Sequence, residues 1–561
     1  MRWTLKPQPD PTDVKNLSEA LGVPDQISHL LMQRNIKTFE EAKAFFRPNI
    51  AQMHDPFLMK DMQKAVDRIL LALKNKERIL VYGDYDVDGT TSVALLSSYL
   101  DNFSNQISTY IPDRYEEGYG ISYQGIDFAS DNDITLIIAL DCGIKAIDKV
   151  AYATQKGIDF VICDHHRPGT KIPEAVAVLD PKREDCLYPF KELCGCGVGF
   201  KLIQALSQKK GNNPEELLPY LDLVATAIAA DIVPIIGENR ILAYHGLRVI
   251  NSNPRTGIRA LIKEVKKEEL TITDVVFIIA PRINAAGRMK HGQHAVQLLK
   301  EKTPDAALQL ASEIELFNSE RKSADRSITI EALAQITENE EEKNATSVVY
   351  HESWHKGVIG IVASRLIETY YRPTLVFTKS GDKLAASARS IKGFDVYEAL
   401  HQCADYIEQF GGHKYAAGLT LKQDQYEIFK QKFEEVVAST LPSQLKTPEI
   451  SIDLPLEFEE ITPKFHRILK QFAPFGPGNM SPVFLTENVR DSGYGKCVGA
   501  DNKHLKAKFV KGDYRINAIG FNLGAKCEKI QNQKKCTIAY GIDENEWNGE
   551  VSLQLKIKDI K

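Results

Sequence analysis

The sequence predicts an α/β protein with two sheet-containing domains joined by a long helix, followed by a small C-terminal β-barrel. Short apolar runs alternate with helical stretches from Arg78 onward, and a long charged helical stretch begins at Pro304. The last part of the chain holds short β-like runs. Strand–helix alternation of this kind is typical of a parallel sheet covered by helices on both faces.

The composition is that of an ordinary globular chain. Of 561 residues, 43% are apolar and 26% are charged, and at about 100 to 200 residues per domain this length predicts three or four domains. No apolar run approaches the roughly 18 residues of a membrane span, and Met1–Pro11 lacks the apolar core of a secretory signal. The nine scattered cysteines favour reduced thiols. We therefore expect a cytoplasmic protein that makes no membrane contact.

Changes of pattern along the chain predict five segments. The net charge of −5 counts against a protein that coats nucleic acid, but it is compatible with an enzyme that has a local basic groove. The expected segments are an N-terminal cap over 1–75, a first α/β domain over 76–300, a linker helix over 301–345, a second α/β domain over 346–445 and a barrel domain over 446–561.

The first α/β domain is expected to hold five strands, and acidic residues follow three of them. In an open parallel sheet, ligands gather beyond the carboxyl ends of the strands, so these residues are expected to meet at one edge. A further acid closes a helical stretch that ends at Ala230. The expected strands are Ile79–Tyr82, Ile107–Ile111, Thr135–Leu140, Phe160–Cys163 and Ala175–Leu179, and the residues expected at the edge are Asp84, Asp86, Asp88, Asp141, Asp164, His165, His166 and Asp231.

Several carboxylates at one point repel each other, and protonation or bound cations must relieve that repulsion. Oxygen ligands with one imidazole suit Mn²⁺ or Mg²⁺ better than a structural zinc. A carboxylate shared by two such ions gives a paired site about 3.5 to 4 Å across, the arrangement that serves in-line phosphoryl displacement. We therefore predict two divalent ions at this edge.

Each motif also has a purely structural interpretation. An Asp after a strand is often a helix N-cap or a turn residue, and Asp-His-His can be a surface loop. The Asp-x-Asp-x-Asp-Gly pattern is shared with calcium loops, but Leu95 stands where such a loop needs a Glu. The joint occurrence of the motifs in this order is far more specific than any one of them.

The motifs in this order resemble those of the DHH phosphoesterase superfamily, and Gly411–Gly418 resembles the glycine-rich signature of the DHHA1 domain that accompanies it. Within the superfamily the chain is most similar to the RecJ family of nucleases. That similarity rests on Arg282–Met289, on Ser387–Ser390 with Gly393–Asp395, and on a C-terminal β segment where the family carries an OB-fold. The resemblance covers the chain from about Ile79 onward.

The resemblance implies roles for individual residues at the predicted edge. One metal would be held by Asp86 and Asp141, with Asp141 bridging to the second metal. Tyr82 stands where many members have a histidine, so a ligand or a supporting contact is expected to be missing there. The implied ligands of the second metal are Asp88, Asp141, His165 and Asp231, with Asp84 beside the site and His166 at the scissile phosphate or the leaving oxygen.

By the same resemblance, the activity is that of a metal-dependent 5′-to-3′ exonuclease specific for single-stranded DNA. It would release 5′-mononucleotides by two-metal-ion hydrolysis in DNA repair and recombination, beside a helicase and a single-strand-binding protein. Phosphate oxygens would be clamped by Arg282, Asn284 and Arg288, two arginines around an Asn-Ala-Ala-Gly turn. The alternative for this segment is a helix-capping loop with surface arginines.

Two segments of the second α/β domain are expected to contact the substrate as well. The missing side chains of Gly411 and Gly412 would let a phosphate or sugar approach the backbone, while His413 reaches the site. Arg389 with Ser387 would clamp the 5′-terminal phosphate. The alternative for the glycine segment is a tight turn before a helix.

Aromatic and basic residues alternate in the predicted barrel, as in proteins that bind single strands without reading sequence. The alternative is a small barrel with core aromatics and a solvated basic face. The aromatic residues are Tyr494, Phe509, Tyr514 and Phe521, and the basic ones are Lys496, Lys503, Lys506, Lys508, Lys511 and Arg515.

Three rival functions stay open at this point. The first is a DHH phosphodiesterase for short oligoribonucleotides or cyclic dinucleotides, a group that is usually shorter and lacks the barrel. The second is a manganese pyrophosphatase, which shares the metal motifs but not the Gly-Gly-His segment. The third is a non-catalytic scaffold related to RecJ, which the presence of every expected metal ligand makes a poor match.

Overall fold

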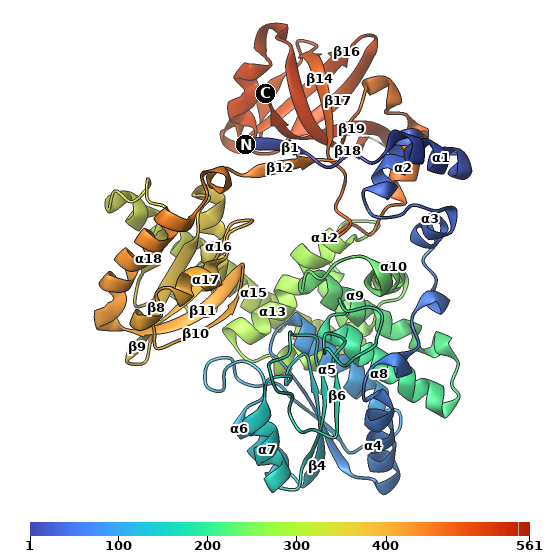
Figure 1. Ribbon diagram of the computed structural model, residues 1–561, viewed down its shortest axis with the longest axis vertical. Helices are drawn as coiled ribbons and strands as arrows, with labels where there is room; N and C mark the ends of the chain where they lie inside the picture. The colour runs from blue at the N-terminus through green and yellow to red at the C-terminus, as the bar shows by residue number, and fades with distance from the viewer. Residues whose placement is uncertain (548) are drawn as a thin grey trace.

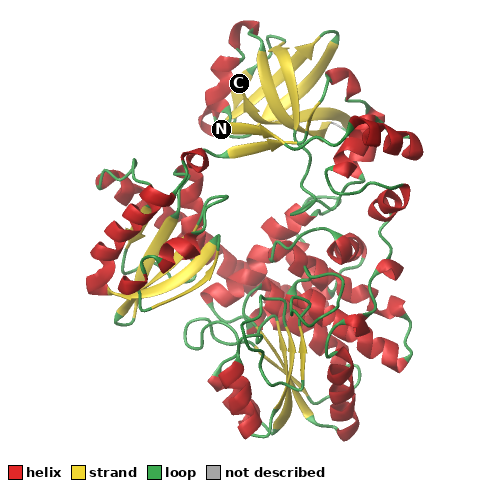
Figure 2. Ribbon diagram, in the orientation of Figure 1, coloured by secondary structure: helices red, strands yellow, loops and turns green. Residues whose placement is uncertain are grey.

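The computed structural model describes residues 1–547 and 549–561, which form three sheet-containing domains (Figure 1). Figure 2 shows a large sheet in each domain, with helices beside it. The first α/β domain lies at the bottom of this view, the second at the left and the barrel domain at the top. The predicted fold class is confirmed.

The first sheet has five parallel strands in the order β3-β2-β4-β5-β6. Its strands are short and almost wholly apolar because both faces are covered. Helices α6 and α7 cover one face, and the other face packs against a larger core that contains α4, α5, α8 and α9. The strands are β2 (Arg78–Gly83), β3 (Ile107–Tyr110), β4 (Ile134–Leu140), β5 (Asp159–Cys163) and β6 (Ala177–Leu179).

Helices make up the rest of this domain, and one of them corrects a prediction. The segment expected to turn at Asn-Ala-Ala-Gly is a continuous helix, α13, in which Gly287 lets the backbone approach Tyr85 closely: a Cβ at Gly287 would lie 2.5 Å from the Tyr85 carbonyl oxygen. The helices are α4 (Met62–Asn75), α5 (Val87–Leu100), α6 (Tyr123–Asp131), α7 (Ile147–Gln155), α8 (Gly195–Lys210), α9 (Leu221–Ala230), α10 (Gly237–Ser252), α11 (Thr256–Ile262), α12 (Ile272–Asp274), the π-helical turn η4 (Val275–Ile279), α13 (Ala280–Met289) and α14 (Gln293–Lys300).

A single helix of 35 residues, α15 (Pro304–Glu338), leads into the second α/β domain. That domain has a five-stranded sheet in the order β10-β11-β9-β8-β7, with only β7 and β8 parallel among these pairs. Its elements are β7 (Ser347–Tyr350), α16 (Ile359–Thr369), β8 (Thr374–Ser380), β9 (Lys383–Arg389), α17 (Val396–His401), β10 (Gln409–His413), β11 (Ala416–Lys422) and α18 (Tyr426–Thr440).

The third domain is a ring of strands in the order β13-β14-β18-β19-β17-β16-β15, and an additional pairing of β14 with β16 closes it. The barrel-like form agrees with the predicted OB-fold. Its elements are β12 (Glu449–Ile452), β13 (Leu454–Pro455), α19 (Pro463–Lys470), β14 (Phe484–Asp491), β15 (Lys496–Val498), β16 (His504–Lys511), β17 (Tyr514–Gly520), β18 (Cys536–Trp547) and β19 (Glu550–Ile560).

The N-terminal segment packs against two different domains. Strand β1 (Arg2–Leu5) pairs in parallel with β12, and α1 (Pro11–Leu21), α2 (Asp25–Met32) and α3 (Phe39–Phe46) extend from it. Residues of these three helices share one hydrophobic core with the barrel domain, whereas α4 packs into the core of the first domain. Both chain ends therefore lie on the barrel domain (Figure 1). Among the helices of the described residues, none combines the length and the apolar character that a membrane span requires.

Candidate metal centre

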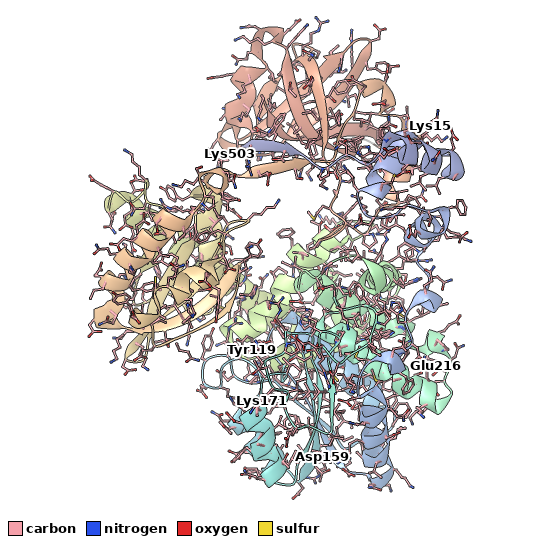
Figure 3. The ribbon with its side chains drawn as sticks, viewed as in Figure 1. Lys15, Tyr119, Asp159, Lys171, Glu216 and Lys503 are labelled. Atoms are coloured by element: carbon pink, nitrogen blue, oxygen red, sulfur yellow. The ribbon has the colours of Figure 1, made fainter. Side chains whose placement is uncertain are left out.

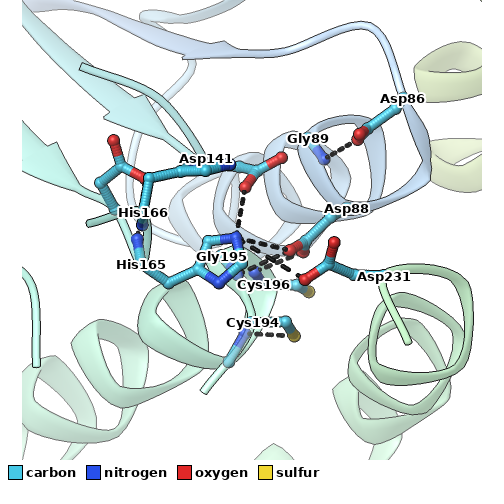
Figure 4. Close-up of polar contacts among 12 residues, drawn as sticks. Asp86, Asp88, Gly89, Asp141, His165, His166, Cys194, Gly195, Cys196 and Asp231 are labelled. Atoms are coloured by element: carbon cyan, nitrogen blue, oxygen red, sulfur yellow. Dashed lines mark hydrogen bonds and ion pairs between the residues drawn. The ribbon is translucent and has the colours of Figure 1, made fainter. Parts of the chain in front are cut away.

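Four predicted ligands meet beyond the carboxyl ends of the first sheet. Figure 3 places Tyr119 at this edge of the domain and Asp159, the first residue of β5, at the opposite end of the sheet. The imidazole of His165 lies between the carboxylates (Figure 4): its Nε2 is 3.2 Å from Asp141 Oδ1, 3.7 Å from Asp231 Oδ2 and 3.8 Å from Asp88 Oδ2. Asp88, Asp141 and His165 are buried, and Asp231 is 31% exposed. The centre therefore opens to solvent beside Asp231.

The N-terminus of α8 holds Asp88 in place. The amides of Gly195 and Cys196 donate to the two carboxylate oxygens of Asp88, each over 2.7 Å. A helix N-terminus favours a negative charge, because its first amides have no partner inside the helix. Gly195 also has to be a glycine, since a Cβ there would lie 2.5 Å from the Cβ of Asp141.

The first Asp motif supplies both a helix cap and acidic groups. Asp86 is the N-cap of α5 and accepts from the Gly89 amide over 3.0 Å, so it has a structural role, and its charge also acts on the carboxylates of the centre. Asp84 is fully buried and accepts from the Gly120 amide over 3.3 Å. Tyr82 also stabilises the loop that contains Gly120, because its hydroxyl donates to the Gly120 carbonyl over 2.8 Å.

Mutual repulsion and burial dominate the electrostatics of the centre. Burial, and then the charge of Asp86, raises the pKa of Asp88 to about 7. Burial, Asp88 and Asp86 raise the pKa of Asp231 to about 8, and burial with the same two charges holds the pKa of Asp141 well above its usual range. Cations bound among these carboxylates would remove the repulsion.

Asp164 organises the two histidines that follow it. It accepts from the amides of His165 and His166 over 2.7 and 3.1 Å, and from His166 Nδ1 over 2.8 Å. Burial would raise the pKa of Asp164, but the bond from His166 lowers it to about 2. Burial likewise opposes protonation of His166, yet Asp164 raises the pKa of His166 to about 9. The Nε2 of His166 then points to the Tyr119 hydroxyl, 3.1 Å away.

The donor set fits divalent ions. Burial, then the neighbouring charge of His166, lowers the pKa of His165 to about 3, so its imidazole is neutral and free to bind a metal. Neither ring nitrogen of His165, nor Asp141 Oδ1, nor Asp84 Oδ2 has a hydrogen-bond partner among the described residues. Buried polar atoms are rarely left without a partner. Three or more ligand atoms come within 4.8 Å of one another in two sets, Asp88 with His165 and Asp231, and Asp141 with His165 and His166.

Three arginines gather where the two α/β domains meet, and we call Arg114, Arg288 and Arg389 the arginine cluster. Burial, and then repulsion from Arg114 and Arg389, lowers the pKa of Arg288 to about 9. Burial and Arg114 also lower the pKa of Arg389. In the described part of the chain, Arg288 and Arg389 donate to a carbonyl and a hydroxyl, and no carboxylate raises the pKa of either. Unneutralised, partly buried guanidinium groups are a site for an anion.

A helix, a strand and a loop from the two domains position the arginine cluster. Arg389 lies at the end of β9 and donates to the Ser387 hydroxyl over 3.0 Å, beside the first turn of α16. Arg288 donates across the domain boundary to the Gly357 carbonyl over 2.8 Å. Arg114 lies in the loop after β3 with its guanidinium carbon 4.2 Å from the centre of the Tyr85 ring. Sequence reasoning missed Arg114, although its place after a strand's carboxyl end was the available signal.

The other two members of the predicted arginine motif differ in their surroundings. Arg282 donates to the Ile278 carbonyl over 2.6 Å and pairs with Glu315 of α15 at 2.6 Å, so its charge is already neutralised. Residues four apart share a helix face, so Asn284 lies on the face of Arg288 and Arg282 on another. The clamp roles of Arg282 and Asn284 stay predictions.

The glycine segment is part of a strand, not a turn before a helix. Gly411, Gly412 and His413 lie on the edge strand β10, and Gly412 pairs with Ala417. A Cβ at Gly412 would lie 2.4 Å from the Ala416 carbonyl oxygen. The surface of His413 is accessible to solvent, but its ring is partly buried. That partial burial, and then the charges of Arg389 and His166, lower the pKa of His413. The charges of both domains therefore act on His413.

In the barrel domain, the predicted aromatic set divides in two. Phe509 is fully buried and belongs to the core, which corrects its expected place on a binding face. Tyr494, Tyr514 and Phe521 are exposed. Lys496 lies 5.4 Å from the Tyr494 ring centre and Lys556 lies 5.8 Å from that of Phe521, so the exposed rings have basic neighbours.

Comparison with known families matches all three domains. The model of the DHH family N-terminal domain matches residues 78–228, that of the DHHA1 domain residues 342–439 and that of the RecJ OB domain residues 452–559. The single-stranded-DNA-specific exonuclease RecJ of Bacillus subtilis is 38% identical over 100% of this chain and 70% of its own length. The chain belongs to the RecJ family. The RecJ exonuclease of Escherichia coli is 32% identical over 96% of both chains.

Solved structures of RecJ proteins have the same fold. The crystal structure of RecJ from Thermus thermophilus in complex with Mn²⁺ has a TM-score of 0.85 and 26% identity, and covers 100% of this chain and 79% of that one. The structure of the same RecJ with Mg²⁺ has a TM-score of 0.79 and 25% identity, with 100% and 78% covered. Both ions belong to the class that the carboxylate and imidazole donors of this chain predict.

Proposed function

We propose that this RecJ-family protein is a metal-dependent exonuclease specific for single-stranded DNA, which releases 5′-mononucleotides from the 5′ end in DNA repair and recombination. The observation that carries the proposal is the pairing of a buried acidic centre in the first domain with the arginine cluster at the boundary to the second. Bound cations offset the charge of the acidic centre, and a bound anion offsets the charge of the arginine cluster. A terminal phosphate next to a scissile phosphodiester supplies that anion.

The chain's own residues position the reacting groups. Mn²⁺ or Mg²⁺ ions held by Asp86, Asp88, Asp141, His165 and Asp231 supply the Lewis acidity that lowers the pKa of water and offsets phosphate charge. His166 keeps its Nδ1 on Asp164, which leaves Nε2 to donate to the scissile phosphate or the leaving oxygen. The α8 amides and Asp164 restrain Asp88 and His165 before substrate arrives.

The direction of cleavage depends on which end of the DNA strand the arginine cluster binds. Arg389 and Ser387 would bind the 5′-terminal phosphate, with Arg114 and Arg288 completing the pocket and Asn284 beside them. The Gly411–Gly412 strand would let the first sugar approach, and His413 would face the nucleotide being released. Because this pocket accepts a chain end, the enzyme would release one nucleotide at a time. The exposed aromatic and basic residues of the barrel would hold the rest of the strand without reading its sequence.

The test is nucleotide release from internally labelled single-stranded DNA with Mn²⁺, with either the 5′ or the 3′ end blocked. We expect mononucleotides only when the 5′ end is free. Asp141→Ala should abolish release, while Leu187→Ala, a change of an exposed leucine outside the site, should not. Release that needs a free 3′ end would refute the polarity. Turnover of dinucleotides or short RNA, with none from long DNA, would favour the oligonucleotide phosphodiesterase.

The setting of the enzyme is also part of the proposal. Its nine cysteines are all free thiols, which supports a reducing compartment, the cytoplasm. Family members often work beside a helicase, which would supply the single strand, and a single-strand-binding protein, which would hold it. Stimulation of nucleotide release from a duplex by a helicase, and a change in rate on coated strands, would test these two partners.

A further inference from the structure

A strained and exposed isoleucine directly follows the metal ligand Asp231. Ile232 has φ of 59°, in the left-handed region, and its residue surface is 63% exposed. A β-branched residue at positive φ is an outlier that costs free energy, and such residues persist where the surrounding structure holds them. An exposed apolar side chain does not compensate for that cost by burial. The position therefore calls for a functional explanation.

Two more exposed apolar side chains continue from Ile232 towards the barrel domain. Ile236 is 42% exposed and Met480 is 61% exposed. They come from loops that pack on each other: the Ile235 amide donates to the Pro477 carbonyl over 2.7 Å, and a Cβ at Gly478 would lie 3.0 Å from Ile236. We call Ile232, Ile236 and Met480 the apolar step.

The apolar step is anchored rather than mobile. At one end of the loop, Asp231 lies 3.7 Å from His165 Nε2, and at the other end Glu238 is held in a buried network. Glu238 accepts from the His54 amide over 3.0 Å, from the Tyr188 hydroxyl over 2.6 Å and from Lys201 Nζ over 3.1 Å. On the barrel side, Arg34 donates to Asn479 over 2.7 Å. A rigid apolar surface can support a flat partner in one position.

The uncharged side chains of the apolar step determine which part of a DNA strand they can contact. If the 5′-terminal phosphate occupies the arginine cluster and the scissile phosphate the metal centre, Asp231, whose side chain is 31% exposed, offers the remaining strand an exit on the side of the barrel domain. The loop after Asp231 is in contact with the barrel domain that would hold that strand. Three uncharged side chains offer nothing to a phosphate, but they match the apolar face of a base.

We infer that Ile232 is a substrate-positioning residue that contacts the base on the 3′ side of the scissile phosphate. Ile236 and Met480 contact the bases that follow it, on the side of the barrel domain. The contact holds the nucleotide that becomes the next 5′ end and so keeps the scissile phosphate in register with the metal ligands. This inference rests on the proposed nuclease function and adds a residue-level contact to it.

The test combines a variant of Ile232 with a strand that lacks one base. Asn and Gly tolerate positive φ, so Ile232→Asn and Ile232→Gly remove the apolar contact while keeping or easing the backbone. Single-turnover release of the first nucleotide is measured on an intact strand and on a strand with an abasic second position. In the wild type, the missing base should slow release about fivefold or more. In both variants, the intact strand should be slowed by a similar factor and the missing base should add nothing.

Matched controls separate the contact from a general defect. Ile232→Val keeps a branched apolar side chain and should retain the abasic penalty. An abasic position far from the 5′ end should slow no form of the enzyme in this assay. Melting temperatures of the Gly and Asn variants should equal or exceed that of the wild type.

The outcomes distinguish the inference from the proposed function. An abasic penalty of the same size in wild type and in Ile232→Asn would overturn the inference, and so would an active wild type that is indifferent to the missing base. A wild type that releases nothing from either strand would overturn the proposed function, and the inference with it.

Discussion

The metal centre lies inside one domain, whereas the arginine cluster lies between two. Asp141 and His165 follow neighbouring strands of a single buried sheet, Asp231 follows helix α9, and backbone amides restrain Asp88. The arginines come from a loop after β3, from α13 and from β9, the last of which lies beyond the 35-residue helix α15. In the proposed function, the chemistry is therefore preorganised by one domain, whereas the binding of a chain end depends on how two domains are placed.

The largest effect is expected at the bridging ligand. Asp141→Asn should lower the rate of nucleotide release by more than about 10³-fold, because both metals lose a shared ligand. Without metal, however, the variant should melt at a higher temperature than the wild type, since one of several repelling buried carboxylates is gone. Rates and melting curves with Mn²⁺ and with EDTA check both statements. A variant that is less stable than the wild type in EDTA would contradict the repulsion argument.

A smaller but still large effect is expected at Gly195. In Gly195→Ala the new Cβ must displace Asp141 and disturb the amide that holds Asp88, so activity should fall about 100-fold, in part recoverable at high Mn²⁺ concentration. The measurement is a Mn²⁺ titration of the rate. Gly197→Ala in the same helix meets only side-chain atoms of Leu193 and Cys194, from 3.3 Å, and should change the rate far less. Equal losses in the two variants would point to a general defect of α8.

The arginine cluster should show a third effect that depends on the substrate end. Arg389→Ala removes charged hydrogen bonds to the terminal phosphate, so kcat/KM on a 5′-phosphorylated strand should fall about 10- to 30-fold. On a strand with a 5′-hydroxyl the loss should be much smaller. Kinetics on the two strands check this, and a variant that keeps the full preference for a 5′-phosphate would remove Arg389 from the pocket.

The smallest effect is expected on the barrel. Phe521→Ala removes one stacking surface among several, so affinity for a long single strand should fall about fivefold, at the low end for a base contact. Cleavage of a strand too short to reach the barrel should not change. Fluorescence anisotropy with long and short strands measures this, with Phe39→Ala, an exposed aromatic of α3, as the control. Equal losses on both lengths would place Phe521 outside the strand path.

How much the sequence predicts depends on whether a feature is local. The meeting of Asp88, Asp141 and His165 was predictable because a strand followed by an acid or a histidine is a local pattern, and the topology of a parallel sheet brings such ends together. The segment around Asn284 was predicted as a turn because Ala and Gly leave the choice open. In the structure the segment is helical, and Gly287 lets this helix pack closely against Tyr85, a contact 202 residues away that no local pattern contains.

Features assembled between domains were harder to predict. Arg114 follows the carboxyl end of a strand, but the sequence alone does not show that Arg288 and Arg389 lie near it. Phe509 and Phe521 lie in similar alternating patterns, yet one is in the barrel core and the other outside it. Phe509 lies within strand β16 and faces the core, whereas Phe521 lies in the turn that follows β17. No sequence pattern indicated which domain helices α1 to α3 pack against.

The pairing of β1 with β12 has a consequence for how the protein is made. Trp3 donates to Asp559 over 2.9 Å, and the two residues are 556 positions apart. At about 5 to 20 residues per second, the ribosome needs roughly half a minute to two minutes to reach the second of them. The first α/β domain can fold during this time, but the opening strand and helices α1 to α3 have to wait for their partner. Strand β1 is thus synthesised long before its partners and is among the last elements to pack.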